Sequence, residues 1–273
     1  MWQCPICAKP LALANKSWRC ENNHTFDCAK SGYVNLLPVQ QKKSKQPGDD
    51  KTMVRARQHF HQQGGYQPLM NWLADEVKCH FAAQDHVHIY DAGCGEGSYL
   101  ASICEQLQTQ GVQVTGAGSD ISKIAVELAS KVYKQQHFAV ATSVNLPVPD
   151  NSLDVVIQVF APGSSNEYSR VLKKGGLLVT VDPAAKHLWE LKTQIYASPE
   201  QHDETLVARA NFELIKDERL GFDVKLSTTQ QRTSLLQMTP YYWKLNSQRC
   251  DSLIQSLESV SAQFAIRVWE NKA

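Results

Sequence analysis

Residues 89–100, IYDAGCGEGSYL, limit the possible folds more than any other stretch of this chain. An apolar strand ends at Asp91, and a helix begins after a turn with three glycines at alternate positions, Gly93, Gly95 and Gly97. Glycines at such a turn allow backbone angles that other residues avoid, and they let a ligand lie against the main chain. We therefore expect a strand–loop–helix unit that binds a cofactor.

The spacing of these glycines distinguishes between cofactors. Dinucleotide-binding loops use G-x-G-x-x-G and hold a pyrophosphate at the start of the helix. Here the order is G-x-G-x-G, and Glu96 adds a negative charge to the loop. A carboxylate disfavours a pyrophosphate and suits a cofactor with a cationic centre. An enzyme that uses nicotinamide is therefore the less favoured structural alternative.

Strand and helix patterns alternate from about residue 86 onward. Apolar segments predict strands over 86–93, 113–120, 137–142, 153–161 and 176–182. The segments between them predict helices near 97–109, 122–135, 164–172 and 186–196. This alternation is typical of an α/β fold of the Rossmann-like kind, with a mostly parallel sheet covered on both faces. In the last third, two long strands, 212–220 and 263–270, flank a helix over 228–238.

Polar residues follow the second and third predicted strands. Asp120 ends the second strand, where a carboxylate accepts hydrogen bonds from the ribose hydroxyls of an adenosine. The alternative is that Asp120 only caps the next helix. Ser143, Asn145 and Leu146 follow the third strand, where they would cradle an adenine ring.

Four potential metal ligands lie within the first 24 residues, Cys4, Cys7, Cys20 and His24. Thiolate and imidazole ligands paired on tight turns are typical of tetrahedral structural zinc sites. Two alternatives stay open: Cys28 could replace His24 as the fourth ligand, or the C-x2-C pair could be redox-active. Only three residues precede Cys4, too few for the strand that a redox motif needs, so zinc is favoured.

Charge is unevenly distributed along the chain. Residues 1–60 contain ten Lys or Arg and four Asp or Glu, a net charge of +6, which leaves −5 on the rest. A basic arm on an acidic body suggests contact with a polyanion, and a solvated linker is the alternative. A helix is expected over 52–61 with Arg55, Arg57 and His59 on its surface. The candidates for RNA contact are Lys42, Lys43, Arg55 and Arg57.

The chain has no apolar run long enough to span a membrane and no secretory signal at its start. We therefore expect a cytoplasmic protein. The eight cysteines are then interpreted as ligands or core thiols rather than disulfides, because the cytosol keeps thiols reduced.

Over about residues 90–185, the glycine loop, Asp120 and the L-P…S-L-D segment resemble a class I S-adenosylmethionine-dependent methyltransferase. Nearly the whole chain resembles the bacterial 23S rRNA (guanine-N1)-methyltransferases of the RlmA type. The motifs that carry this wider resemblance are the Cys3His knuckle, GYVNLLPVQ, PGDD, GGYQPL, the glycine loop, DPAAKHLWELK and LLQMTPYYW. The resemblance implies a seven-stranded, mostly parallel sheet with a small N-terminal zinc-binding module.

The resemblance also implies function. The expected reaction transfers a methyl group from S-adenosylmethionine to N1 of a guanine in a hairpin loop of domain II of 23S rRNA. A structural zinc ion is held by the four ligands above, and a homodimer places two zinc modules beside an RNA-binding cleft. The implied cofactor residues are Tyr66, Asp91, Gly93, Gly95, Glu96, Gly97, Ser98, Asp120, Ser143, Asn145, Leu146 and His187. Three parts are expected: a zinc-binding RNA-recognition module over 1–37, a linker and helix over 38–66, and the methyltransferase domain over 67–273.

Methyl transfer from a sulfonium is an in-line displacement that depends on alignment rather than on a covalent catalyst. A guanine N1 must lose its proton as it attacks. A carboxylate or a water molecule could accept that proton, and Asp182 is the candidate carboxylate. A helix N-cap before Pro183 is the alternative role of Asp182. The chain departs from the family at Asp182 and at the glycine of FAPG, Gly163, so the contacts with the target base are the least specified.

Two other functions compete with this one. A small-molecule methyltransferase with an accessory zinc module would retain turnover without the first 40 residues. A non-enzymatic RNA-binding protein would bind no cofactor, although the glycine loop and Asp120 are intact.

Overall fold

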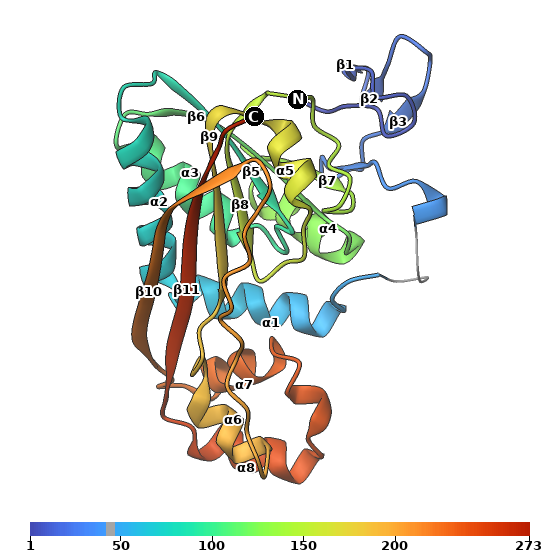
Figure 1. The fold of residues 1–273 in the computed structure, drawn as a ribbon. Coiled ribbons are helices and arrows are strands. Elements are labelled where there is room, and N and C mark those ends of the chain that lie inside the picture. The colour runs from blue at the N-terminus through green and yellow to red at the C-terminus, as the bar shows by residue number, and fades with distance from the viewer. Residues whose placement is uncertain (42–46) are drawn as a thin grey trace.

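The computed structural model describes residues 1–41 and 47–273. Lys42, Lys43 and Lys45 lie outside these ranges. The described chain forms a small three-stranded sheet near the N-terminus and a large eight-stranded sheet with helices packed on it (Figure 1).

The small sheet consists of β1 (Ala12–Ala14), β2 (Ser17–Arg19) and β3 (Thr25–Asp27), all antiparallel. Asn15 and Lys16 join β1 to β2, and both have positive φ angles, 48° and 67°. Such a two-residue turn matches the twist of a hairpin. The sequence did not predict these strands, because three-residue strands show no measurable alternation of apolar and polar residues.

The large sheet has the order β10-β11-β9-β8-β5-β6-β7-β4. Its strands are β4 (Val34–Asn35), β5 (His86–Ala92), β6 (Gln113–Asp120), β7 (His137–Val140), β8 (Leu153–Val159), β9 (Leu172–Pro183), β10 (Phe212–Lys225) and β11 (Ser259–Asn271). Strands β4 to β9 run parallel to one another, and β11 lies antiparallel between β9 and β10. The expected seven-stranded, mostly parallel sheet is confirmed, and β4 adds an eighth strand at its edge.

The helices are α1 (Lys51–Gln62), α2 (Gln67–Phe81), α3 (Ser98–Thr109), α4 (Lys123–Val132), α5 (Ser165–Val171), α6 (Trp189–Ile195), α7 (Thr229–Gln237) and α8 (Ser247–Ser256). Two short 3-10 helices cover Val39–Gln41 and Tyr242–Lys244. Helix α8 was not predicted from the sequence. Within the described residues, no helix is both long and apolar enough to cross a membrane.

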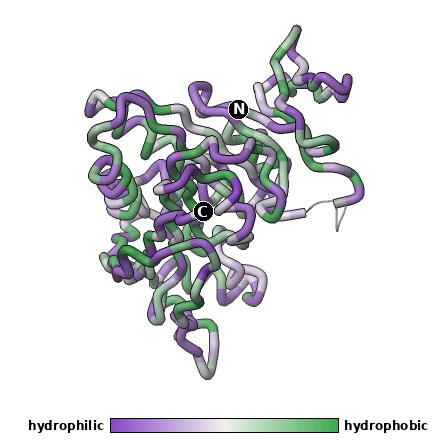
Figure 2. Tube along the Cα trace, turned by 45° about the horizontal axis from the view of Figure 1, so that its top comes forward, coloured by the Kyte–Doolittle hydropathy of each residue, from purple (hydrophilic) through white to green (hydrophobic). Residues whose placement is uncertain are grey.

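One face of the large sheet is covered by helices. Residues of α2, α3 and α4 pack on it, among them Leu69, Leu73, Leu100, Ile103 and Val126. Figure 1 shows α2 and α3 to the left of the strands, and Figure 2 shows hydrophobic residues, in green, gathered in the interior of the molecule. Helices α6, α7 and α8 lie together at one end of the molecule, beyond α1 (Figure 1).

The other face is covered by α5 and by the start of the chain. Trp2 is 2% exposed, and its ring meets the ring of Tyr90 in β5 edge-on, with centroids 6.4 Å apart. Leu11, Cys4 and Cys20 belong to the same buried cluster as residues of β5, β8 and β9. The zinc-ligand region therefore shares a hydrophobic core with the large sheet.

The PGDD segment sets the position of α1. Asp50 is the N-cap, since its side chain accepts hydrogen bonds from the backbone N–H groups of Thr52 and Met53. Gly48 has φ +82°, and a Cβ there would lie 2.8 Å from the Cβ of Ser122. The chain therefore passes close to Ser122, whose hydroxyl donates to the carbonyl of Asp49 at 2.9 Å and holds the start of α1 against the loop between β6 and α4.

Candidate cofactor and zinc sites

The glycine loop lies at the carboxyl end of β5. Gly93, Gly95 and Gly97 have φ angles of 90°, 54° and 88°, which other residues rarely adopt. A Cβ on Gly93 would lie 2.4 Å from the Cβ of Ala161, so the loop packs directly against the segment after β8. The backbone N–H groups of Gly93 and Cys94 donate to the carbonyl of Ser119. The loop is thus fixed between β6 and the end of β8.

Asp91 is buried beneath this loop without a partner. Its side chain is 1% exposed, and within the described residues neither carboxylate oxygen has a hydrogen-bond partner. Burial, together with the charges of Asp120 and Glu96, raises the pKa of Asp91 to about 8. An unpaired buried acid is costly, and a cationic ligand would offset that cost. The site therefore fits a cofactor with an ammonium or sulfonium group.

Asp120 ends β6 and accepts two backbone hydrogen bonds. Its Oδ2 accepts from the N–H of Gly95 at 3.0 Å, and its Oδ1 accepts from the N–H of Ser122 at 2.7 Å. The N-cap of α4 is Ser122, not Asp120. Helix capping is therefore not the role of Asp120. Its two bonds hold the carboxylate beside the glycine loop, and burial raises its pKa.

Glu96 belongs to a buried network that the sequence did not predict. Its Oε1 lies 2.8 Å from Nδ1 of His61 in α1, and both side chains are 2% exposed. Its Oε2 accepts from the hydroxyl of Ser98 at 2.7 Å, and that hydroxyl lies 3.0 Å from the hydroxyl of Tyr133. The charge of Glu96 is thus directed toward α1.

Arg57 and Asp49 complete this contact between α1 and the loop. The Arg57 guanidinium lies 2.7 Å from Asp49, and its Nη1 lies 3.6 Å from the position of a Cβ on Gly95. Burial opposes the charge of Arg57, but Asp49, Glu96 and Asp120 outweigh it and raise its pKa. Arg57 is half-buried, with its side chain 26% exposed, and RNA contact by Arg57 stays a prediction. Arg55 and His59 are exposed, as predicted.

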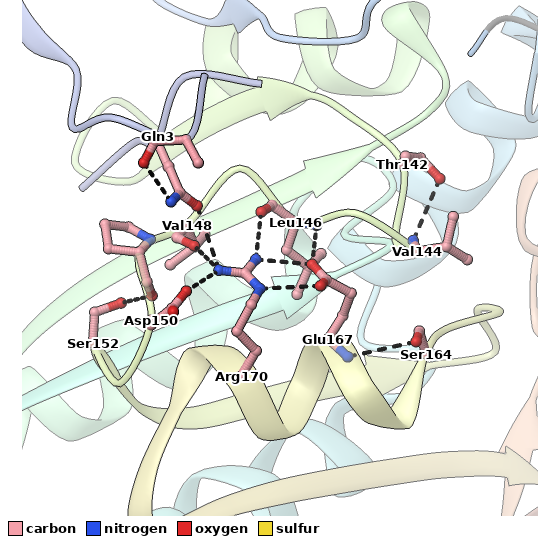
Figure 3. Close-up of polar contacts among 12 residues, drawn as sticks. Gln3, Thr142, Val144, Leu146, Val148, Asp150, Ser152, Ser164, Glu167 and Arg170 are labelled. Atoms are coloured by element: carbon pink, nitrogen blue, oxygen red, sulfur yellow. Dashed lines mark hydrogen bonds and ion pairs between the residues drawn. The ribbon is translucent and has the colours of Figure 1, made fainter. Parts of the chain in front are cut away.

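The segment after β7 is held by Arg170 of α5 (Figure 3). Arg170 donates to the carbonyls of Leu146 and Val148, at 2.9 and 2.8 Å. Glu167 pairs with Arg170 at 2.8 Å and accepts the backbone N–H of Leu146. The Nη1 atom of Arg170 also lies 3.4 Å from Oε1 of Gln3, the residue that precedes the zinc ligand Cys4. Leu146 is buried, whereas Ser143 is half-buried and Asn145 is exposed.

Tyr66 and His187 meet in an aromatic cluster. The hydroxyl of Tyr66 lies 3.4 Å from Nε2 of His187, and Nδ1 of His187 lies 2.8 Å from the carbonyl of Gln263. Burial lowers the pKa of His187 to about 4, so the imidazole is neutral. Apart from the family resemblance, the sequence suggested a surface histidine. His187 is instead 7% exposed.

Asp182 lies within β9, so a helix N-cap before Pro183 is not its role. It pairs with Ala265 in β11, while its neighbour Pro183 pairs with Phe264. Successive residues of a strand point to opposite faces. Asp182 therefore lies on the opposite face from Phe264 and the aromatic cluster, and the structure does not bring it together with them.

The four predicted zinc ligands come together in the N-terminal module. The Sγ atom of Cys20 lies 3.7 Å from that of Cys7 and 3.4 Å from Nδ1 of His24. Cys4 lies 3.5 Å from the same nitrogen, and all four ligand atoms lie within 4.8 Å of one another. Two sulfurs bound to tetrahedral zinc at about 2.3 Å are about 3.8 Å apart, so the cluster fits a zinc ion. Cys28 is not part of this cluster.

The burial of Asp91 predicts a pH dependence of cofactor binding. Its pKa is about 4 in the unfolded chain and about 8 in the folded one, so across this window only the folded chain holds the proton. Stability without cofactor should therefore fall as the pH rises from 4 to 8. A cationic cofactor favours the carboxylate, so its affinity should rise between pH 6 and 8, by up to about tenfold per unit.

Calorimetric titration with S-adenosylmethionine checks this prediction. The change Asp91→Asn should weaken binding and remove the dependence on pH. The control Glu127→Gln, at an exposed acid of α4, should preserve it. An affinity of the unchanged chain that stays constant from pH 6 to 8 would contradict the assignment.

Comparison with known proteins agrees with both sites. Residues 2–45 match the family model described as "RlmA, N-terminal", a zinc ribbon, and residues 83–238 match a methyltransferase domain. A Bacillus subtilis relative named as a putative 23S rRNA (guanine-N(1)-)-methyltransferase is 34% identical over 266 residues, which are 95% of this chain and 92% of that protein.

Two further relatives come from Streptomyces and Micromonospora. The 23S rRNA (guanine(748)-N(1))-methyltransferase of Streptomyces fradiae is 34% identical, over 82% of this chain and 79% of its own. A putative 23S rRNA (guanine-N(1)-)-methyltransferase of Micromonospora griseorubida is 35% identical, over 69% and 68%. The Bacillus alignment covers enough of the chain to include both the zinc ribbon and the glycine loop. The chain therefore belongs to the family of 23S rRNA (guanine-N1)-methyltransferases, S-adenosylmethionine-dependent enzymes with a zinc ribbon.

Proposed function

We propose that this protein methylates N1 of one guanine in a hairpin loop of domain II of 23S rRNA. One observation carries the proposal: the zinc-ligand module shares a buried core with the sheet that ends in the glycine loop. A module built into the catalytic domain suits a large substrate that must be held near the cofactor. The relatives named above, which match most of the chain, support the same substrate.

Most of the predicted cofactor residues lie at or just after the ends of β5, β6 and β7, as a cofactor at the carboxyl edge of a sheet requires. Tyr66 instead precedes α2, and His187 follows β9. We propose that Asp91 faces the cationic part of S-adenosylmethionine and that Asp120 accepts from its ribose. The three glycines let the cofactor approach the backbone, while Leu146 with Ser143 and Asn145 borders the adenine. Glu96 and Ser98 hold the loop to α1, and Tyr66 and His187 close the other side.

Bound S-adenosylmethionine supplies an electrophilic methyl group on a sulfonium. The chain aligns the guanine N1 with that methyl group and excludes water, which is where most of the acceleration of such a displacement arises. N1 loses its proton during attack. Asp182 as the acceptor stays a prediction, and its face of β9 favours a water molecule in that role. The base must leave its stack to reach the site, which a hairpin loop makes easier.

We also propose that the enzyme works in the cytoplasm as a homodimer, as the resemblance implies. The rRNA substrate supports the cytoplasmic location, because rRNA is found where ribosomes are assembled. The predicted division into a zinc module over 1–37, a linker and helix over 38–66 and a methyltransferase domain over 67–273 remains a proposal, and β4 crosses it because Val34–Asn35 pairs with β7.

Transfer of a tritiated methyl group from S-adenosylmethionine to unmodified 23S rRNA tests the proposed reaction. Nuclease digestion and chromatography should show the label in 1-methylguanosine at a single site. The change Asp120→Ala should raise the KM for the cofactor by about tenfold or more, because the alanine can accept neither the two backbone hydrogen bonds nor the one from the ribose. The control Asp251→Ala, at an exposed residue of α8, should not.

Label in another nucleoside would contradict the guanine-N1 assignment but keep an RNA methyltransferase. Absence of label in RNA, with cofactor still bound, would instead favour a small-molecule substrate.

A second prediction concerns how the zinc module holds RNA. Its four basic residues are all exposed, and Lys9 pairs with Glu21. The other three should each meet a phosphate, Lys16, Arg19 and Lys30. Their combined change to alanine should weaken binding of the rRNA hairpin. It should also lower the slope of log Kd against log salt by about 0.7–0.9 for each phosphate that the variant no longer neutralises.

The matched control removes the same charge elsewhere, by changing three exposed lysines of the methyltransferase body to alanine, Lys131, Lys225 and Lys272. Its salt slope should stay near that of the unchanged protein. If both triple variants lowered the slope equally, the zinc module would have no special role in holding RNA.

A further inference from the structure

Phe160 occupies a strained and exposed position at the carboxyl end of β8. Its φ angle is +52°, in the left-handed region that aromatic residues rarely adopt. Its side chain is also among the few exposed large apolar ones of the described chain, at 42%. Both features oppose stability, because strained backbone and exposed apolar surface each cost free energy. Such positions persist where function requires them.

The segment around Phe160 is held firmly in this conformation. The N–H of Phe160 donates to the carbonyl of Val181 in β9 at 2.9 Å. The side chain of Gln158 donates to the carbonyl of Ala161. Ala161 in turn packs against Gly93, where no side chain would fit. Phe160 therefore directly precedes Ala161, the residue that contacts the glycine loop.

The ring of Phe160 rests on a buried aromatic base. Its centroid lies 5.5 Å from that of His187 and 5.8 Å from that of Phe264, which is fully buried. His187 and Phe264 are 5.0 Å apart and also contact Tyr66. These neighbours support one side of the Phe160 ring and leave part of it open to solvent. A supported, partly exposed ring beside a cofactor loop is suited to stacking with a planar ligand.

We propose that Phe160 stacks on the target guanine and positions its N1 for methyl transfer. This assignment rests on the proposed function and specifies how its substrate is held. The cofactor and zinc residues that the family resemblance implies do not include Phe160, so this part of the site has no assigned role. An unstacked base loses its neighbours in the RNA, and an aromatic side chain replaces that contact. The strained backbone at Phe160 thus keeps an aromatic face beside the glycine loop, where it can stack on the target guanine.

Three variants separate stacking from simple apolar contact. Phe160→Leu keeps an apolar side chain but removes the aromatic face, whereas Phe160→Tyr and Phe160→Trp keep it. The control Ile215→Ala removes an apolar side chain of similar exposure, 39%, at the bulge of the edge strand β10. For each protein, kcat/KM is measured with unmodified 23S rRNA, and the Kd of S-adenosylmethionine is measured by calorimetry without RNA.

Phe160→Leu should lower kcat/KM for RNA by about ten- to a hundredfold, the range expected when one base–aromatic stack is removed. Its Kd for the cofactor should stay within about twofold. Phe160→Tyr and Phe160→Trp should recover most of the activity, and Ile215→Ala should match the unchanged protein.

The assignment would be overturned by full activity of Phe160→Leu, or by a parallel loss of cofactor affinity, which would make Phe160 part of the cofactor site. It would also be overturned if Tyr and Trp failed to restore activity. Absence of methyl transfer to RNA by the unchanged protein would be a different result, because it removes the proposed function itself.

Discussion

A mostly parallel sheet must be covered on both faces, and in this protein the start of the chain covers part of one. Trp2 packs against Tyr90 of β5, and the zinc ligands Cys4 and Cys20 lie in the same buried cluster. The zinc module is therefore a layer of the fold. Its position follows from the requirement to bury the sheet, and the zinc ion would stabilise the turns that carry Trp2. Through Gln3 and Arg170, the same contact reaches the loop that contains Leu146.

The cofactor loop depends on a second contact, with α1. The loop gathers several acids near one another, Asp91, Glu96 and Asp120, and like charges in a buried site repel. Helix α1 supplies His61 to Glu96 and places Arg57 beside Asp49 and the glycine loop. Of these acids, only Asp91 is left without a hydrogen-bond partner within the described residues. A cationic ligand would therefore gain the most binding free energy next to Asp91. The helix that follows the zinc module thus shapes the charge of the site.

The sequence predicted the parallel strands and the glycine loop because apolar strands and alternate glycines produce strong local patterns. The zinc ligands were predictable from spacing for the same reason. The contact of Arg57 with Asp49 beside the glycine loop was not predicted, because a helical pattern shows which residues face a core but not which side chain reaches a neighbouring loop. His61 and Phe160 were missed, since a buried contact between two side chains and a positive φ angle both arise from tertiary structure. Asp182 remained ambiguous until the register of β9 and β11 fixed its face.

The zinc module and the cofactor site thus form one structural unit. Hydrogen exchange of the unchanged protein and of Trp2→Ala, both without cofactor, tests this coupling. We expect faster exchange in the variant within residues 142–150 and at the end of β5, as well as within residues 1–28. Faster exchange confined to residues 1–28 would show instead that the module is independent of the site.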